Sequence, residues 1–188
     1  MMTHTFYGRK NELCEIRKAL DPSQHGRKIL LLRGIGGSGK TQLALQHIQQ
    51  DGHRYSAILW VNASTTEHAR MSFSEAATMI LSSWPRELPV PFAGSDTDNV
   101  LRVVARLRST RYTNWLMVID SIDDSDGQLS KYVPSGEYGS VLVTSTRQVA
   151  CNGFRPDKPL VVEGLDPQSS RALILGTAER TDTGEDRK

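Results

Sequence analysis

Apolar residues in this chain fall into five short, nearly continuous runs. Such runs are typical of parallel strands that are covered on both faces, because neither side of the strand meets water. The runs cover residues 28–33, 57–61, 115–120, 140–145 and 160–162. Around them, apolar residues recur at helical spacing over residues 9–20, 40–50, 64–84 and 96–109, and a last helix opens at Asp166-Pro167. This alternation predicts an α/β fold with a five-stranded, mainly parallel sheet between two layers of helices.

Two finer expectations concern the helices. Ser64 and Glu67 have the spacing of a capping box, which predicts that Ser64 starts the third helix. In the helix over residues 40–50, we expect Ala44, Leu45 and Ile48 to face the sheet.

A glycine-rich motif follows the first strand and opens the next helix. Residues 34–41 read Gly-Ile-Gly-Gly-Ser-Gly-Lys-Thr, which matches the pattern G-x-x-x-x-G-K-[ST]. Glycines let backbone N–H groups turn inward around phosphates, and the helix start adds the positive end of its dipole. We expect Lys40 to reach the outer phosphates and to take part in catalysis, and the Thr41 hydroxyl to bind Mg²⁺. The predicted nucleotide contacts are Gly34, Gly36, Gly37, Ser38, Gly39, Lys40, Thr41 and Gln42. The chain is therefore predicted to be a three-layer α/β/α P-loop NTPase.

Charged residues follow two later strands. Asp120 ends the third strand, where an acid can bind Mg²⁺ directly or through water. Asp124 or Asp123 could orient or deprotonate the attacking water, although Asp-Asp-Ser-Asp is also ordinary turn composition. Arg147 follows the fourth strand and could stabilise charge on the outer phosphate, or it could form a surface ion pair.

Composition narrows the class of protein. The chain has 188 residues, and its net charge of +2 is too small to indicate a nucleic-acid or membrane partner. Cys14 and Cys151 form no pair motif, and the histidines and cysteines lack zinc-ligand spacing. No apolar stretch is long enough to span a membrane, and the first residues do not form a signal peptide. We expect a cytoplasmic protein.

Four segments resemble the nucleotide-binding domain of STAND-class signalling NTPases, in the NB-ARC/NACHT group of NOD-like receptors. They are residues 6–13 (FYGRKNEL), 34–45 (GIGGSGKTQLAL), 139–147 (GSVLVTSTR) and 161–165 (VVEGL), and the resemblance covers about residues 6–175. It implies that Tyr7, Gly8 and Arg9 contact the adenine end of the nucleotide. It also implies the phosphate-sensing role of Arg147.

Two departures from that family pattern matter. NB-ARC proteins usually carry two adjacent acids after the metal strand, whereas Asp120-Ser121-Ile122-Asp123-Asp124 is similar to the NACHT form and favours Asp124 as the base. Nothing in the chain matches the helical or winged-helix subdomains that follow in the family. We therefore expect a nucleotide-binding domain over residues 1–180, with a disordered tail over 181–188, that belongs with further receptor domains.

The resemblance implies a switch controlled by ATP (or dATP) and ADP, with Mg²⁺, slow hydrolysis and homo-oligomerisation on activation. Two other functions stay open. The chain could be a metabolic kinase or an AAA+-type ATPase, or it could be a scaffold that holds ADP without hydrolysis.

Overall fold

The computed structural model describes residues 6–83, 103–104, 107, 113–122, 134, 136–146 and 159–181. The strands are β1 (Lys28–Arg33), β2 (Ala57–Asn62), β3 (Trp115–Ile122), β4 (Ser140–Ser145) and β5 (Leu160–Val161). The helices are α1 (Lys10–Ala19), α2 (Lys40–Asp51), the short 3-10 helix η1 (Gly52–Arg54), α3 (Thr66–Ser83) and α5 (Pro167–Thr181). No helix in these ranges is both long and apolar enough to cross a bilayer.

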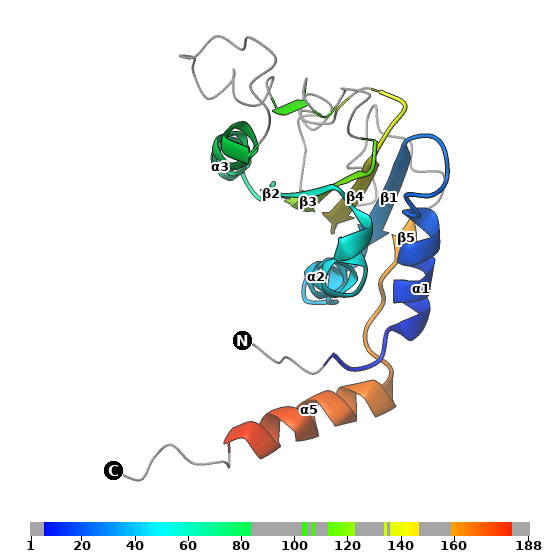
Figure 1. Cartoon of the computed structure of the whole chain (residues 1–188). Coiled ribbons are helices and arrows are strands. Elements are labelled where there is room, and N and C mark those ends of the chain that lie inside the picture. The colour runs from blue at the N-terminus through cyan, green and yellow to red at the C-terminus, as the bar shows by residue number, and fades with distance from the viewer. Residues whose placement is uncertain are drawn as a thin grey trace.

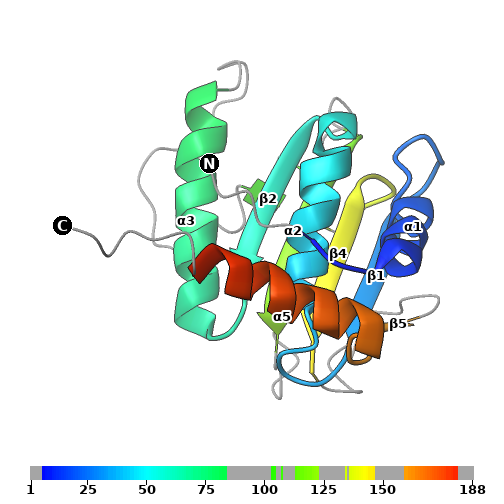
Figure 2. The same ribbon diagram turned by 90° about the horizontal axis from the view of Figure 1, so that it is seen from below.

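The five strands form one sheet in the order β2-β3-β4-β1-β5. Every strand pair is parallel, which confirms the predicted α/β fold. In Figure 1, α3 lies on one side of the sheet and α1 and α2 lie on the other. Figure 2 shows α5 on the outer side of α2, farther from the sheet. Because all strands run the same way, their carboxyl ends lie at one edge of the sheet, where β1 leads into residues 34–39.

The core has two halves, one on each face of the sheet. Alternate residues of β1 serve the two halves: Leu30 and Leu32 pack with α1 and α2, whereas Leu31 packs on the α3 side. Phe73 of α3 and Leu43 of α2 are fully buried on these opposite faces. Burial on both faces explains why the strand sequences are almost continuously apolar.

Two expectations about the helices are wrong in detail. The N-cap of α3 is Thr65 rather than Ser64, because the Thr65 hydroxyl accepts the His68 amide at 3.1 Å while the Ser64 hydroxyl bonds to Asn62. On α2, Leu45 is 44% exposed and Leu43 takes the buried position. The helix is turned so that Leu45 faces the outer side, toward α5.

Strand β3 continues beyond Asp120, where the apolar pattern predicted its end. Its register against β4 shifts between Ile119 and Ile122, so that Asp120 and Ser121 together oppose Thr144. Ser121 has φ 62°, in the left-handed region. This is a β-bulge, and it changes the direction of the chain beside Asp120.

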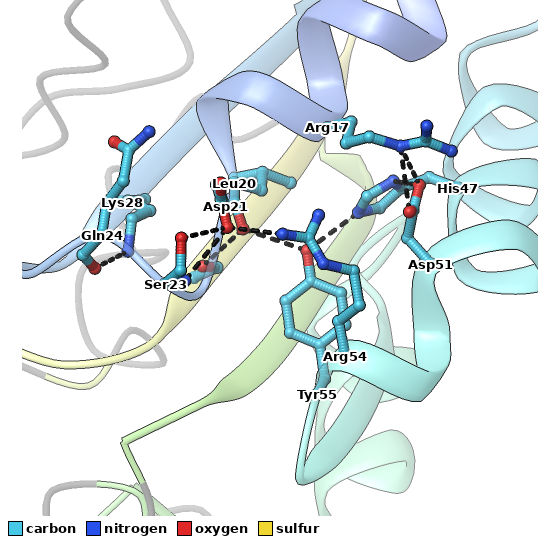
Figure 3. A network of polar contacts seen from close by, with 11 residues as sticks. Arg17, Leu20, Asp21, Ser23, Gln24, Lys28, His47, Asp51, Arg54 and Tyr55 are labelled. Atoms are coloured by element: carbon cyan, nitrogen blue, oxygen red, sulfur yellow. Dashed lines mark hydrogen bonds and ion pairs between the residues drawn. The ribbon is translucent and has the colours of Figure 1, made fainter.

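A buried polar network joins the end of α1 to α2 and η1 (Figure 3). His47 Nε2 lies 2.9 Å from the Tyr55 hydroxyl, and His47 Nδ1 lies 3.3 Å from the Asp51 carboxylate. Arg17 of α1 reaches the same carboxylate at 3.0 Å. Burial lowers the pKa of His47 and raises that of Tyr55 to about 12. The network fixes α2, the helix that begins at the glycine-rich loop.

Candidate functional site

The glycine-rich loop connects β1 to α2 and closes around the ammonium of Lys40. Lys40 Nζ donates to the carbonyls of Gly34 at 2.9 Å and Ile35 at 2.8 Å. Lys40 is only 8% exposed. Burial lowers the Lys40 pKa, and the negative charge of Asp120 works against that shift. The Lys40 ammonium is therefore held at the start of α2. The N-terminus of a helix also favours a bound anion, such as a phosphate.

Gly34 is required by close packing. Its amide donates to the Ser145 carbonyl at 3.2 Å, and a Cβ at this position would overlap the Val162 carbonyl and crowd the Ser38 hydroxyl. The first residue of the loop thus passes directly against the chain that leaves β5. The loop is anchored to β4 and to the β5 segment even before a ligand is considered.

Three oxygen-bearing side chains meet next to the loop. The Thr41 hydroxyl donates to Asp120 Oδ1 at 2.9 Å, and the Thr144 hydroxyl donates to the same oxygen at 2.6 Å. Proteins commonly hold nucleotide-bound Mg²⁺ with one or two hard oxygen ligands, while phosphates and water supply the rest. The Thr41 hydroxyl and the Asp120 carboxylate are hard oxygen ligands of that kind and lie together, so the residues fit a magnesium ion.

A cavity of about 760 Å³ opens on the outer side of the loop. Its walls come from the segment before α1, the loop, the exposed face of α2 and the start of α5. The lining side chains include the aromatic and aliphatic residues Phe6, Tyr7, Leu45, Leu165 and Leu173. Gln42, which is exposed, and Gly36, Gly37, Ser38 and Gly39 also border it. A cavity with apolar side chains on its walls and the glycine-rich loop at its edge suits a ligand with a flat base and a charged tail.

Arg9 connects three parts of this site. Its guanidinium donates to Glu12 at 2.8 Å, to the Ser38 carbonyl of the loop at 3.0 Å, and to the Glu163 carbonyl after β5. Its side chain is 6% exposed, and its backbone has φ 60°. Arg9 also borders the cavity, together with Tyr7. A Cβ on Gly8 would overlap the Ser169 hydroxyl, so the segment before α1 lies against α5.

The structure therefore brings Tyr7, Arg9, Gln42 and residues 36–39 of the loop to one cavity, whereas Gly8, Gly34 and Lys40 do not border it. Thr41 and Asp120 are hydrogen-bonded to each other where α2 begins. Asp123, Asp124 and Arg147 lie outside the described residues. Thr144 was missed by sequence reasoning. A hydroxyl near the end of an apolar strand was the available signal, but the bulge in β3 that places it against Asp120 is not visible in the sequence.

Comparison with known proteins agrees with this geometry. The sequence model of the AAA ATPase domain matches residues 5–135, more than half of the chain. The chain belongs to the AAA ATPase domain family. Domains of this family bind nucleotide, generally with Mg²⁺, and often oligomerise.

A solved structure supports the fold of this AAA ATPase domain. The crystal structure of Cdc6p from Pyrobaculum aerophilum superposes with a TM-score of 0.66 at 12% sequence identity. The match covers 96% of this chain and 52% of that chain, so the AAA ATPase domain spans about half the length of its structural relative. At this identity the similarity shows the fold alone. No curated protein sequence matches the chain.

Proposed function

We propose that this AAA ATPase domain binds ATP or ADP together with Mg²⁺ and hydrolyses ATP slowly. One observation carries the proposal: the hydrogen bond between Thr41 and Asp120, which joins the helix after the glycine-rich loop to the third strand beside the Lys40 ammonium. An NTPase needs a cation for the phosphates and oxygen ligands for a metal within reach of each other.

Each residue would have a separate task in this site. The loop amides and Lys40 would bind and neutralise the phosphates, and the apolar wall with Tyr7 and Leu165 would hold the base. Thr41 and Asp120 would hold Mg²⁺, which when bound supplies positive charge to the outer phosphates. Asp124, or Asp123, would orient the attacking water, and Arg147 would stabilise the charge that develops on the outer phosphate. These last two roles rest on the sequence.

We further propose that the bound nucleotide controls the position of neighbouring segments, as in the NB-ARC/NACHT switches that the motifs resemble. Arg9 supports this reading, because its guanidinium bonds to the loop carbonyl of Ser38 and to Glu163, just before α5. A ligand that moves the loop would change both contacts and so bias α5. The family match supports the ATPase more strongly than the receptor role, which rests on the motifs.

The domain boundaries belong to the same proposal. Residues 1–180 would form the nucleotide-binding domain and 181–188 a tail, within a protein that carries further domains. Oligomerisation in the ATP state is proposed from the same resemblance.

Two assays test the proposal. The purified chain is denatured and any released nucleotide is identified by chromatography; we expect ADP, and GDP would contradict the assignment of the base. Single-turnover ATPase measurements then separate three outcomes. Slow hydrolysis supports the switch, rapid multiple turnover supports a metabolic or mechanical ATPase, and no hydrolysis indicates a domain that only holds the nucleotide.

A further inference from the structure

The Asp120 carboxylate is held from two directions on one of its oxygens. Thr41 and Thr144 both donate to Oδ1, at 2.9 and 2.6 Å. A carboxylate oxygen has about two lone-pair sites, so these two donors fill Oδ1 and leave Oδ2 as the oxygen that can meet a cation. Thr144 is 1% exposed and Asp120 is 9% exposed, so water competes little for these bonds.

The direction of the Thr144 proton is fixed by the bulge in β3. The Ser121 amide donates to the Thr144 hydroxyl at 2.8 Å. A hydroxyl carries a single proton, and with the Ser121 amide on its acceptor side that proton is directed to Asp120. Ser121, with its left-handed φ of 62°, lies in the bulge where the register against β4 shifts. The Ser121 amide in the bulge, the Thr144 hydroxyl and the Asp120 carboxylate thus form one chain of hydrogen bonds.

We propose that Thr144 is a positioning residue for the Mg²⁺ site, acting through Asp120; the proposal rests on the nucleotide-binding function proposed above. Thr144 keeps the carboxylate in one rotation, with Oδ2 available, so that binding the ion needs no reordering of the side chain. Without the hydroxyl, the Ser121 amide loses the Thr144 oxygen, and of the two described donors to the carboxylate only Thr41 remains. The loss falls on binding that depends on Mg²⁺, because Thr144 is not one of the residues that border the nucleotide cavity.

The test compares nucleotide affinity in Mg²⁺ and in EDTA for the full chain. The variants are Thr144→Val, which removes the hydroxyl and keeps the shape, and Thr144→Ser, which keeps the hydroxyl. Thr78→Val is the control, because its exposed hydroxyl bonds within α3, to the Ser74 carbonyl at 3.0 Å, in the part of the chain that the structure describes. Calorimetry with ADP in each buffer gives the ratio of the two affinities, a readout independent of hydrolysis. Circular dichroism checks that each variant is folded.

We expect the gain in affinity from Mg²⁺ to be about tenfold smaller in Thr144→Val, a difference of about 1.4 kcal/mol. Affinity in EDTA should be unchanged, and Thr144→Ser and Thr78→Val should behave as the unmodified chain. An undiminished gain in Thr144→Val, or a loss in Thr144→Ser equal to that in Thr144→Val, would overturn the proposal. If Thr144→Val does not fold, Thr144→Ala replaces it with the same expected ratio. A chain that binds no ADP in either buffer would instead contradict the proposed function itself.

Discussion

Replacing Lys40 by Met tests two roles of its buried ammonium, one in nucleotide affinity and one in the stability of the fold. Lys40 Nζ bonds to two loop carbonyls, of Gly34 and Ile35. Met keeps the apolar stem but removes the charge and both hydrogen bonds. A hydrogen bond to a charged group contributes about 1.5–3 kcal/mol, so loss of one phosphate contact should weaken nucleotide binding about 10- to 150-fold. The free energy of unfolding should fall by about 1–3 kcal/mol, because the two carbonyls lose their donor.

Lys28, the first residue of β1, provides a matched control because it lies at the end of that strand opposite the glycine-rich loop. Its ammonium also donates to two carbonyls, those of Gln24 and Gly26, and burial lowers its pKa as it lowers that of Lys40. Lys28→Met should reduce the free energy of unfolding without changing nucleotide affinity. Calorimetric titration with ADP and Mg²⁺ measures the affinity, and urea unfolding measures the stability. If Lys40→Met is folded and binds ADP as tightly as Lys28→Met, the assignment of the phosphate site is refuted.

The remaining predictions concern pH, packing and the metal ligand. Burial holds the pKa of His47 below its unfolded value of 6.5, so the unfolded chain binds more protons in acid than the folded chain does. The free energy of unfolding should therefore fall as the pH drops below 6.5. Urea unfolding at pH 7.5 and 5.5 measures this dependence, which should be weaker in His47→Gln. Gly139→Ala places a Cβ into the ring of Trp115 at φ 84° and should lower the free energy of unfolding by about 2–5 kcal/mol. Gly26→Ala, at φ 94° in open space, should lower it by about 1–2 kcal/mol, from backbone strain alone. Equal losses on urea unfolding would contradict the packing argument. Asp120→Asn should weaken the stimulation of ADP binding by Mg²⁺ while leaving binding in EDTA intact, and a calorimetric titration that shows the same stimulation as the unmodified chain would remove Asp120 from the metal site.

The sequence predicts those parts of the molecule that are set by local patterns. The continuous apolar runs gave all five strands, because a strand buried on both faces has no polar side to interrupt the run. The loop over residues 34–41 was found because its motif is contiguous and lies between a strand and a helix. The order of the strands, with β4 between β1 and β3, was not predicted, since it depends on contacts between residues far apart in the chain.

The features that were missed or predicted wrongly depend on contacts that a local pattern does not show. Thr144 reads as one more residue of a buried strand until the bulge at Ser121 brings it against Asp120. Leu45 fits an apolar helical stripe, but α2 is oriented by the buried Leu43, so Leu45 borders the cavity instead. Ser64 and Thr65 are both suitable N-caps, and the preceding turn at Asn62 decides between them. In each case the position of the side chain depends on a contact, either with a residue distant in sequence or with a nearby residue, that the sequence pattern does not specify.

The proposed function requires the loop over residues 34–41 to bind an adenine nucleotide. Calorimetric titration of the nucleotide-free chain with ADP and with GDP, both with Mg²⁺, tests it most directly. We expect saturable binding of one ADP per chain and much weaker binding of GDP. Absence of any heat with ADP, from protein that circular dichroism shows to be folded, would contradict it.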